Sequence, residues 1–502
     1  MGEMVEEVPL HSHGVNYVPS PSPLSSLHVI TIAAGGSMRE TPTSTDNNHD
    51  NISHAEANPQ DAWLPVTESR NGNTCTSIFH LLSSGIGFQA LLLPVAFSTL
   101  GCQLKYCRSW GIICLSLAFG WQLYTIWLLL HLHEHVPGTR YSRYLQLSIV
   151  AFGPKIGKVL AIFPVMYLSG GTCVVLIITG SKIMELLFET IHNSESKSLA
   201  GTGWFFVFTC LAIILAQRPN LNSIAGISLI AAITAFGYYT LIWVSTVSKD
   251  RPTGTSHSPL QAGRFDMARL SDILIALGII MLSFRGHNLI LEIQGTLPSS
   301  SKHPSYKPMW RAVLISYILI AMCLFPLVIV GFWAYGNKLP KKIGSMSMFL
   351  QFYSQNASKS IKITLYSLVL ANCLSSFQIY AVPVFDNLEL RYTSIKNKRC
   401  SRRIRTALRL FFGGLAFFVA VAFPFLPSLA AIIGGMALPL TFVYPCFMWI
   451  SIKKPDKDLQ TEEVLEVGRL PRILYILDKF SFTPKVLKLN TLLCNLVNMS
   501  ET

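Results

Sequence analysis

The chain has 502 residues, of which 51% are hydrophobic and 13% are charged. Soluble proteins usually carry about 25% charged residues, so this deficit indicates a membrane protein and excludes an ordinary soluble domain. The formal net charge is +14, but the basic residues lie in loops between apolar runs and form no basic face with interleaved aromatic residues. Such loop charges orient a membrane protein, so we expect contact with a lipid bilayer and no nucleic-acid partner.

The first 73 residues are polar and rich in Ser, Pro, Asn and Thr. They contain no sustained apolar period, which is typical of a disordered segment. The N-terminus has no charged-then-apolar signal peptide, so the first apolar stretch would itself direct insertion. We therefore predict a disordered cytoplasmic tail over residues 1–73.

Ten apolar stretches follow, most of them close to the length of about 20 residues that a helix needs to cross a hydrocarbon core. They are residues 76–100, 110–132, 157–182, 203–218, 223–246, 270–292, 311–335, 361–385, 405–423 and 427–451. Five stretches in each half force the second half to run inverted in the membrane, which is a transporter plan. The sequence thus predicts an all-α polytopic membrane protein with an inverted five-plus-five helix repeat. We place the first repeat at 74–246, the second at 270–452 and an atypical cytoplasmic segment at 453–502.

Lysine and arginine predict the orientation of these stretches. The loop after the eighth stretch is the most basic, the loop after the second contains Arg140 and Arg143, and the loop after the ninth contains none. The positive-inside rule then places the even-numbered loops and both termini in the cytoplasm. Four lysines between Lys338 and Lys359 run against this assignment, whereas the glycosylation sequon at 356–358, in the same outer loop, agrees with it.

Gly85, Ile86 and Gly87 interrupt the first stretch. Each glycine costs about 1 kcal/mol relative to alanine inside a helix. The pair therefore marks either an unwound turn or the close packing of two helices through small residues. The N–H groups of an unwound turn would bind a carboxylate. A matching interruption in the sixth stretch favours the unwound turn.

That second interruption consists of Ser283, Phe284, Arg285, Gly286 and His287. Gly286 would free the backbone, so that the carbonyl groups of Ser283 and Phe284 face a ligand ammonium and the Phe284 ring acts as a lid. An arginine near mid-membrane costs at least about 2.5 kcal/mol, so Arg285 either forms an internal ion pair or takes part in gating. His287 is either a hydrogen-bonded core residue or a proton carrier. Matched breaks in two halves indicate the binding site of a transporter.

Two more stretches carry polar residues on one face. In the third, Tyr167 and Thr172 either meet a substrate carboxylate or belong to a helix interface of small residues. In the eighth, a stripe at helical spacing faces protein or water, either as interhelical hydrogen bonds or as contacts to an ion or substrate. The stripe consists of Asn372, Ser375, Ser376 and Tyr380.

The sequence contains no phosphate-binding loop, nucleophile elbow or zinc-ligand spacing, so we predict neither an enzyme nor a cofactor. The run HLHEH at 131–135 resembles a metal site, but it ends the second stretch on the basic side, where a polar helix end is expected. No carboxylate lies deep in any stretch, and histidine titrates in the useful pH range. The candidates for proton coupling or gating are His80, Arg285, His287 and Glu292.

Five motifs carry a family resemblance: GIGFQALLLPVAF at 85–97, RPNLNS at 218–223, FRGHNLILEIQGT at 284–296, GFWAYGN at 331–337 and PVFDNLE at 383–389. They resemble the plant amino acid/auxin permease family of the amino acid-polyamine-organocation superfamily, and within it the lysine histidine transporter-like subgroup. The resemblance covers about residues 60–456. It implies a proton-coupled amino acid symporter in the plasma membrane, with broken helices in an inverted repeat and the proton gradient as its energy source.

Two segments depart from the family pattern. Residues 102–109 look like an insertion between the first and second stretches, and beyond Lys457 the last helix of the family is replaced by a mixed amphipathic run.

From the breaks and the resemblance we expect alternating access around a site between stretches 1, 3, 6 and 8. Two alternatives stay open: an amino acid sensor or receptor without transport, and an auxin-type organic acid carrier.

Overall fold

The structure is a computed structural model that describes residues 63–453, apart from 101, 104–107, 137, 193–198, 200, 219, 249–254, 256–266, 301, 340–345, 356, 427–433 and 436. All of the described residues belong to one unit, His54–Thr502. The expected tail over 1–62 and the atypical segment after Lys453 lie outside them.

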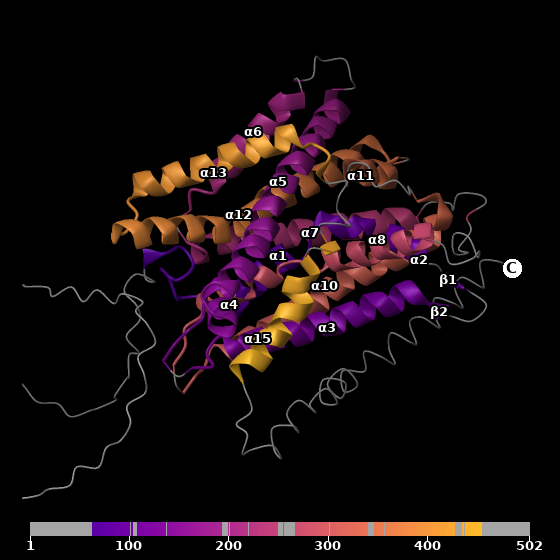
Figure 1. The fold of residues 1–502 in the computed structure, drawn as a ribbon. Coiled ribbons are helices and arrows are strands. Elements are labelled where there is room, and N and C mark those ends of the chain that lie inside the picture. The colour runs from indigo at the N-terminus through magenta and orange to yellow at the C-terminus, as the bar shows by residue number, and fades with distance from the viewer. Residues whose placement is uncertain are drawn as a thin grey trace, which may run out of the picture. The chain divides into compact units, whose positions relative to one another are not determined.

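Helices make up almost all of the described structure (Figure 1). The α-helices are α1 Thr74–Gly85, α2 Leu93–Leu100, α3 Trp110–Leu132, α4 Tyr144–Phe152, α5 Ile156–His192, α6 Gly201–Leu215, α7 Ala225–Val247, α8 Met267–Ser283, α9 Ile290–Gly295, α10 Tyr306–Tyr335, α11 Met346–Ser354, α12 Lys359–Lys396, α13 Arg402–Ala422 and α15 Tyr444–Ile452. Short 3-10 turns are η2 Phe88–Leu92, η4 Asn222–Ile224, η5 His287–Leu289 and η6 Gly336–Lys338, and η8 Pro439–Val443 is a π-helix. Two short antiparallel strands, β1 Cys102–Gln103 and β2 Arg108–Ser109, lie in the segment that we interpreted as an insertion.

Seven of the described helices are long and apolar enough to cross a membrane. The number rises to eight if Thr74–Gly85 and Phe88–Leu100, which meet at a bend of 43°, form one span. Eight of the ten predicted stretches thus correspond to helices of spanning length. The other two, 203–218 and 427–451, correspond to shorter apolar helices, Gly201–Leu215 and Pro439–Ile452. The ten-span inverted repeat stays a prediction.

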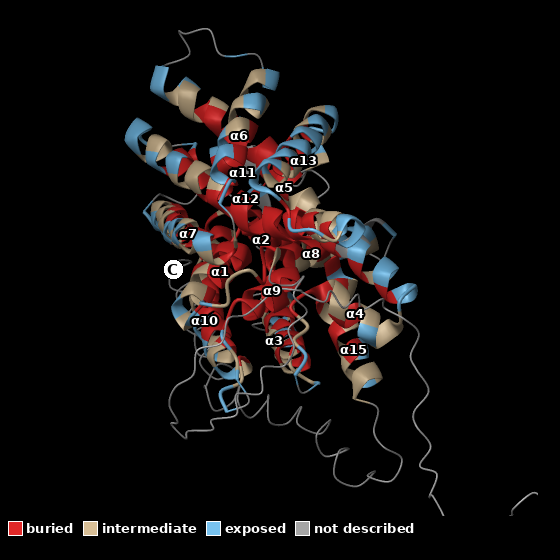
Figure 2. Cartoon of the chain, turned by 90° about the vertical axis from the view of Figure 1, so that its left-hand side faces the viewer, coloured by how far each residue is buried: buried red, intermediate tan, exposed pale blue. Residues whose placement is uncertain are grey.

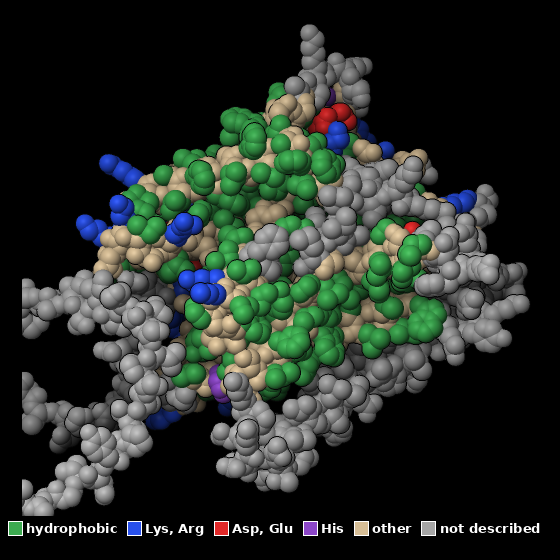
Figure 3. Space-filling model, in the orientation of Figure 1, with side chains coloured by type: hydrophobic (Ala, Val, Ile, Leu, Met, Phe, Trp, Pro, Cys, Tyr) green, Lys and Arg blue, Asp and Glu red, His purple; other side chains and the backbone are tan. Residues whose placement is uncertain are grey.

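The outer surface of the bundle is strongly apolar, and hydrophobic side chains cover much of the face in Figure 3. Large side chains on α6, α13 and α15 that would be buried in a soluble protein are 61–68% exposed; they are Phe206, Ile214, Phe411, Phe418 and Ile450. Such a surface is matched by hydrocarbon rather than water. The chain is therefore a multi-pass membrane protein.

The centre of the bundle holds the interrupted helices. Buried residues concentrate along α1, α2, α9 and α12 in Figure 2. α12 packs against both α5 and α7, and 78% of its most apolar window is buried. α1 packs against α7 and α10, and α8 packs against α2 and η2. The helix interruptions therefore lie in the protein interior and not against lipid. Unpaired backbone groups inside a membrane require such a protein environment.

Residues 63–73 pack against the bundle, although the sequence predicted them to be part of a disordered tail. Leu64 and Val66 are fully buried. The Val66 N–H donates to the Asp386 carboxylate of α12 at 3.2 Å, and the Leu221 N–H donates to the Pro65 carbonyl at 3.3 Å. Leu64 and Val66 are isolated apolar residues in a polar segment, so they form no apolar pattern. The residues that contact this segment, Asp386 and Leu221, are distant in sequence. The prediction of disorder is wrong for these residues.

Candidate functional site

Both predicted helix breaks are confirmed. α1 ends at Gly85, and Ile86 (φ −101°, ψ 108°) and Gly87 (φ −129°, ψ 153°) are extended before η2 begins. α8 ends at Ser283, and Gly286 has a left-handed conformation (φ 84°, ψ −2°) before η5 begins. Only glycine adopts that conformation without a steric penalty, so Gly286 fixes the position of the second break.

The two breaks lie directly against each other. A Cβ atom placed on Gly286 would be 2.7 Å from the Ser84 hydroxyl oxygen of α1. A Cβ atom placed on Gly87 would be 2.9 Å from Cζ of Arg285. Each glycine therefore makes room for the other break, and the interrupted segments of the first and sixth stretches form one site.

Two tyrosines from other helices satisfy the carbonyl groups of the first break. Tyr380 of α12 donates its hydroxyl to the Ser84 carbonyl at 2.5 Å and accepts a hydrogen bond from Nε of Arg285 at 3.1 Å. Tyr239 of α7 donates to the Gly87 carbonyl at 2.7 Å. Tyr380 was predicted only as part of a polar stripe, and Tyr239 was not predicted. The signal for both is a tyrosine hydroxyl in an apolar helix, which needs a partner when it is buried.

Arg285 is 9% exposed, and its Cζ lies 4.6 Å from the centre of the Tyr380 ring. Nη1 and Nη2 make no hydrogen bond to any described residue. The internal ion pair that we considered for Arg285 is not seen among the described residues, where its contacts are to the hydroxyl and ring of Tyr380.

Phe284 and Ser283 lie at the end of α8, facing α3. The Phe284 ring centre is 6.0 Å from that of Phe119, and its carbonyl accepts a long hydrogen bond from Nε2 of Gln122 at 3.5 Å. The Ser283 hydroxyl donates to the Ile279 carbonyl within its own helix at 2.9 Å. Gln122 and Phe119, which the sequence analysis did not identify, are therefore α3 side chains that reach this break.

The third stretch reaches the site through Ser169. Tyr167 and Thr172 are half-buried on α5. The Ser169 hydroxyl, which is fully buried, accepts a hydrogen bond from Nδ2 of Asn288 in η5 at 2.8 Å. The stretch was predicted to line a site together with stretches 1, 6 and 8, and its observed contact with the second break is made by Ser169.

In the eighth stretch, Asn372 and Ser375 are buried on α12. Asn372 donates Nδ2 to the Ala231 carbonyl of α7 at 2.9 Å. This contact agrees with the interhelical alternative for Asn372, whereas Tyr380 brings the stripe into contact with the breaks.

The three titratable proton candidates differ in their surroundings. Nδ1 of His80 lies 2.8 Å from the Ser228 hydroxyl and joins α1 to α7. His287 is 1% exposed, and neither ring nitrogen has a hydrogen-bond partner among the described residues. Glu292 is 3% exposed on α9, and its Oε2 has no partner there.

The comparisons with known proteins decide the family. The family model of the transmembrane amino acid transporter proteins matches residues 70–467, somewhat beyond the point near Lys457 where the motif resemblance ended. The chain belongs to the transmembrane amino acid transporter family.

Two curated relatives from Arabidopsis thaliana agree with this assignment. Lysine histidine transporter-like 8 is 52% identical over 402 residues, which cover 80% of this chain and 76% of that protein. Lysine histidine transporter-like 7 is 48% identical over 80% of this chain and 82% of that protein. A solved sodium-coupled sialic acid symporter in its substrate-bound outward-open state covers 80% of this chain and 83% of its own, with 12% identity and a TM-score of 0.49. The predicted subgroup is confirmed, as is the expectation that the chain is not an enzyme.

In this family member, the motif at 383–389 supports an ion-pair network at one end of the bundle. Arg143, just before α4, lies 2.5 Å from the Asp386 carboxylate of α12, and the two side chains are 3% and 1% exposed. Nη2 of Arg143 also donates to the Thr67 hydroxyl at 3.3 Å. This buried pair thus joins the first described segment, the loop after the second stretch, and α12.

A second set of ion pairs surrounds Glu389, one turn further along α12. Arg405 of α13 contacts Glu389 at 3.0 Å and Glu68 at 3.3 Å, and Arg399 also contacts Glu68. Arg405 further donates to the Trp63 carbonyl at 3.3 Å. The basic loop after the eighth stretch is therefore bound to the segment before α1.

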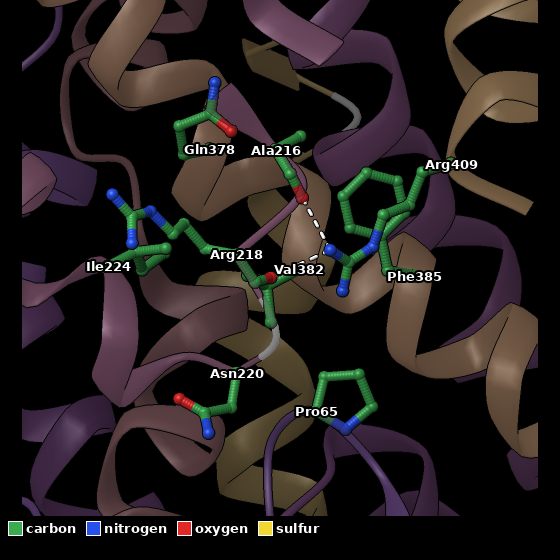
Figure 4. Close-up of a pocket in the computed structure, with 9 residues that line it drawn as sticks. All are labelled: Pro65, Ala216, Arg218, Asn220, Ile224, Gln378, Val382, Phe385 and Arg409. Atoms are coloured by element: carbon green, nitrogen blue, oxygen red, sulfur yellow. Dashed lines mark hydrogen bonds between the residues drawn. The ribbon is translucent and has the colours of Figure 1, made fainter. Parts of the chain in front are cut away.

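A small pocket lies beside this network and not at the helix breaks (Figure 4). Nη1 of Arg409 donates to the carbonyls of Ala216 and Arg218 at 2.7 and 2.8 Å, which satisfies the chain where it leaves α6. The pocket is lined by Pro65, Ala216, Arg218, Asn220, Ile224, Gln378, Val382, Phe385 and Arg409. The sequence analysis did not predict it.

The HLHEH run ends α3 and anchors neighbouring loops. Glu134 accepts a hydrogen bond from the Ser305 hydroxyl at 2.7 Å and lies 3.3 Å from Nε of Arg140. Burial and the positive charge of Arg140 lower the pKa of His133 well below 6.5. His133 is therefore neutral at pH 7, and the run acts in the described structure as a polar helix end.

Proposed function

We propose that the chain is a proton-coupled symporter that imports amino acids across the plasma membrane by alternating access. The observation that carries this proposal is the direct contact between the two helix breaks, Gly87 against Arg285 and Gly286 against Ser84, in a member of an amino acid transporter family. Mid-membrane breaks that face each other are where transporters bind their substrates.

The amino acid is held between the breaks. Its carboxylate meets the first break, where no side chain caps the turn that begins at Gly87. Its ammonium meets carbonyl groups at the end of α8, near Ser283 and Phe284. The stretches that contact these breaks, α3, α5, α7 and α12, form the rest of the site.

The protein crosses the membrane ten times, with both termini in the cytoplasm. The position of the first and last described segments supports an even number of crossings between them. Thr67 contacts Arg143 at the start of α4, and the Ser451 hydroxyl donates to the Ala151 carbonyl at the end of α4 at 2.5 Å. The first and last described segments thus lie at the same short helix, α4. Lys and Arg side chains gather around the α12–α13 turn in Figure 3, and the positive-inside rule assigns such a turn to the cytoplasm.

The test is uptake of labelled amino acids by transport-deficient cells expressing the full chain. Gly87→Val should abolish uptake, because its Cβ would lie 2.5 Å from Oε1 of Gln89 and 2.9 Å from the Arg285 guanidinium. The matched control is Gly414→Val on α13, where a Cβ meets no atom within 4 Å. Surface labelling must find equal amounts of each protein. Full uptake by Gly87→Val contradicts the site, and no uptake by the unaltered protein contradicts the transport.

Two other functions are separated by the same assay. Amino acid binding without uptake in proteoliposomes would identify a sensor or receptor. An organic acid carrier would take up carboxylates without an amine, and the observation that favours it is that Arg285 has no carboxylate partner among the described residues.

A further inference from the structure

Arg285 places a positive charge between the two helix breaks, and no described residue supplies a negative charge that pairs with it. Its side chain is 9% exposed, and the hydrogen bond from Nε to Tyr380 together with the stacking on that ring fixes the plane of the guanidinium. Nη1 and Nη2 have no acceptor among the described residues. A buried charge without a counter-charge is costly in protein and more so in a membrane, so a site built this way is completed by an anion.

We infer that Arg285 binds a carboxylate of the substrate, and that the site therefore selects substrates with a net negative charge, namely amino acids with a second carboxylate. This inference rests on the proposed function and names the substrate class of the same site.

The charge balance around Arg285 carries the inference. The side chains that it touches or faces, Tyr380, Tyr239 and Gln89, are all neutral, and no described carboxylate pairs with it. Asp386 pairs with Arg143, and Glu292, whose Oε2 has no partner among the described residues, makes no described contact with Arg285. With a zwitterionic substrate bound, Arg285 and the substrate together carry a charge of +1, and with a cationic substrate they carry +2. A substrate with one net negative charge brings this sum to zero.

The geometry also suits a carboxylate. A guanidinium held at Nε presents its two Nη groups as a fork, which matches the two oxygens of a carboxylate. Gly87 has no side chain where the guanidinium lies, so these donors are brought to the first break. Oε1 of Gln89 is also buried without a partner and lies at the same place. Arg285 and the first break thus form one receptor for negative charge.

Two kinds of substrate share this chemistry, an acidic amino acid and a carboxylate without an amine. We choose the acidic amino acid, because the carbonyl groups at the end of α8 provide for an ammonium. A panel of glutamate, glutamine, lysine and glutarate separates the two, since glutamine removes one charge and glutarate removes the amine.

The experiment measures uptake in cells and, independently of flux, the ligand-induced shift in Tm of the purified full chain in detergent. The unaltered protein should have a KM for glutamate about 10- to 100-fold lower than for glutamine or lysine, the factor expected for a buried charged hydrogen bond. Arg285→Gln should lose that factor, so that its KM for glutamate is no longer lower than its KM for glutamine. Arg311→Gln, which alters an exposed arginine of α10, should change neither.

The outcomes distinguish this inference from the proposed function. The inference is overturned if the unaltered protein takes up glutamine normally without a preference for glutamate. It is also overturned if Arg285→Gln has the same KM for glutamate as the unaltered protein. Neither result contradicts the proposal that the protein is a transporter. A preference for glutarate over glutamate assigns the anion to an organic acid and overturns the amino acid class. If neither uptake nor a Tm shift occurs with any ligand, both proposals fail. If Arg285→Gln does not fold, the order of the four ligands in the unaltered protein still decides.

Discussion

At the scale of single residues, the site depends on glycines that permit close approach. Gly286 has a positive φ, and a Cβ atom at this position would lie only 2.7 Å from the Ser84 hydroxyl oxygen, so two independent constraints exclude a side chain. Gly87 is extended, which any residue allows, and it is required because the side chains of Gln89 and Arg285 occupy the place of a side chain there. One glycine thus shapes the backbone, whereas the other makes space.

His287 is the residue that we expect to carry the coupled proton. It is buried two residues from the Arg285 charge, and both ring nitrogens are without partners among the described residues. Histidine is the side chain that ordinarily changes charge between pH 5 and 8. Uptake by the unaltered protein should rise as external pH falls, because a proton is imported with the substrate, and His287→Gln should flatten this profile. Uptake rates at four pH values measure it, with His303→Gln, in the loop after α9, as the control. An unchanged profile would show that the proton is carried elsewhere.

At the scale of elements, α12 connects the site to the ion-pair network. Tyr380 contacts both breaks, and Asp386 and Glu389, six and nine residues further along, hold Arg143 and Arg405. A movement of α12 would therefore alter the substrate site and the network together. The sequence motif PVFDNLE marked this helix, but not the partners of its acidic residues.

Replacing Asp386 should strongly destabilise the protein. Asp386→Asn removes the carboxylate that pairs with the buried Arg143, and breaking a buried ion pair costs about 3–5 kcal/mol. The control is Glu185→Gln, whose partner Lys182 is 48% exposed, because such surface pairs contribute about 1 kcal/mol or less. Thermal unfolding of both variants in detergent measures the difference. Equal Tm values would mean that the Arg143 pair does not stabilise the fold.

At the scale of the whole molecule, the first and last described segments both contact α4 or the residue before it. The even-numbered loops lie at the same end of the helix bundle. Arg140, in the loop after the second stretch, donates to the Leu297 carbonyl in the loop after the sixth at 2.9 Å. Arg143 and Arg405 tie the loops after the second and eighth stretches to residues 63–68. Charge counting in the sequence grouped these loops correctly on one side of the bundle.

Cysteine labelling tests which side of the membrane this is. In a cysteine-free background, an impermeant maleimide should label Gly201→Cys, at the start of α6, on intact cells. Arg403→Cys, in the loop after the eighth stretch, should react only after permeabilisation, because the positive-inside rule places that loop in the cytoplasm. Both positions are exposed in the structure. The opposite labelling pattern would invert the proposed orientation.

The sequence by itself determined the membrane class, the family and the places where the helices break. These follow from local properties: apolar runs of spanning length, glycine and arginine inside them, and motifs of neighbouring residues. It did not determine which side chains meet, since the contact of Tyr380 with Ser84 joins positions 296 residues apart and that of Val66 with Asp386 joins positions 320 apart. For the same reason residues 63–73 were predicted to be disordered, Gln122 and Tyr239 were not identified, and the contact of Ser169 with Asn288 was not predicted. Only the tertiary structure decided that the two breaks face each other and that Arg285 has no counter-charge among the residues described around it. The physical reason is that burial and charge balance depend on what surrounds a residue in space.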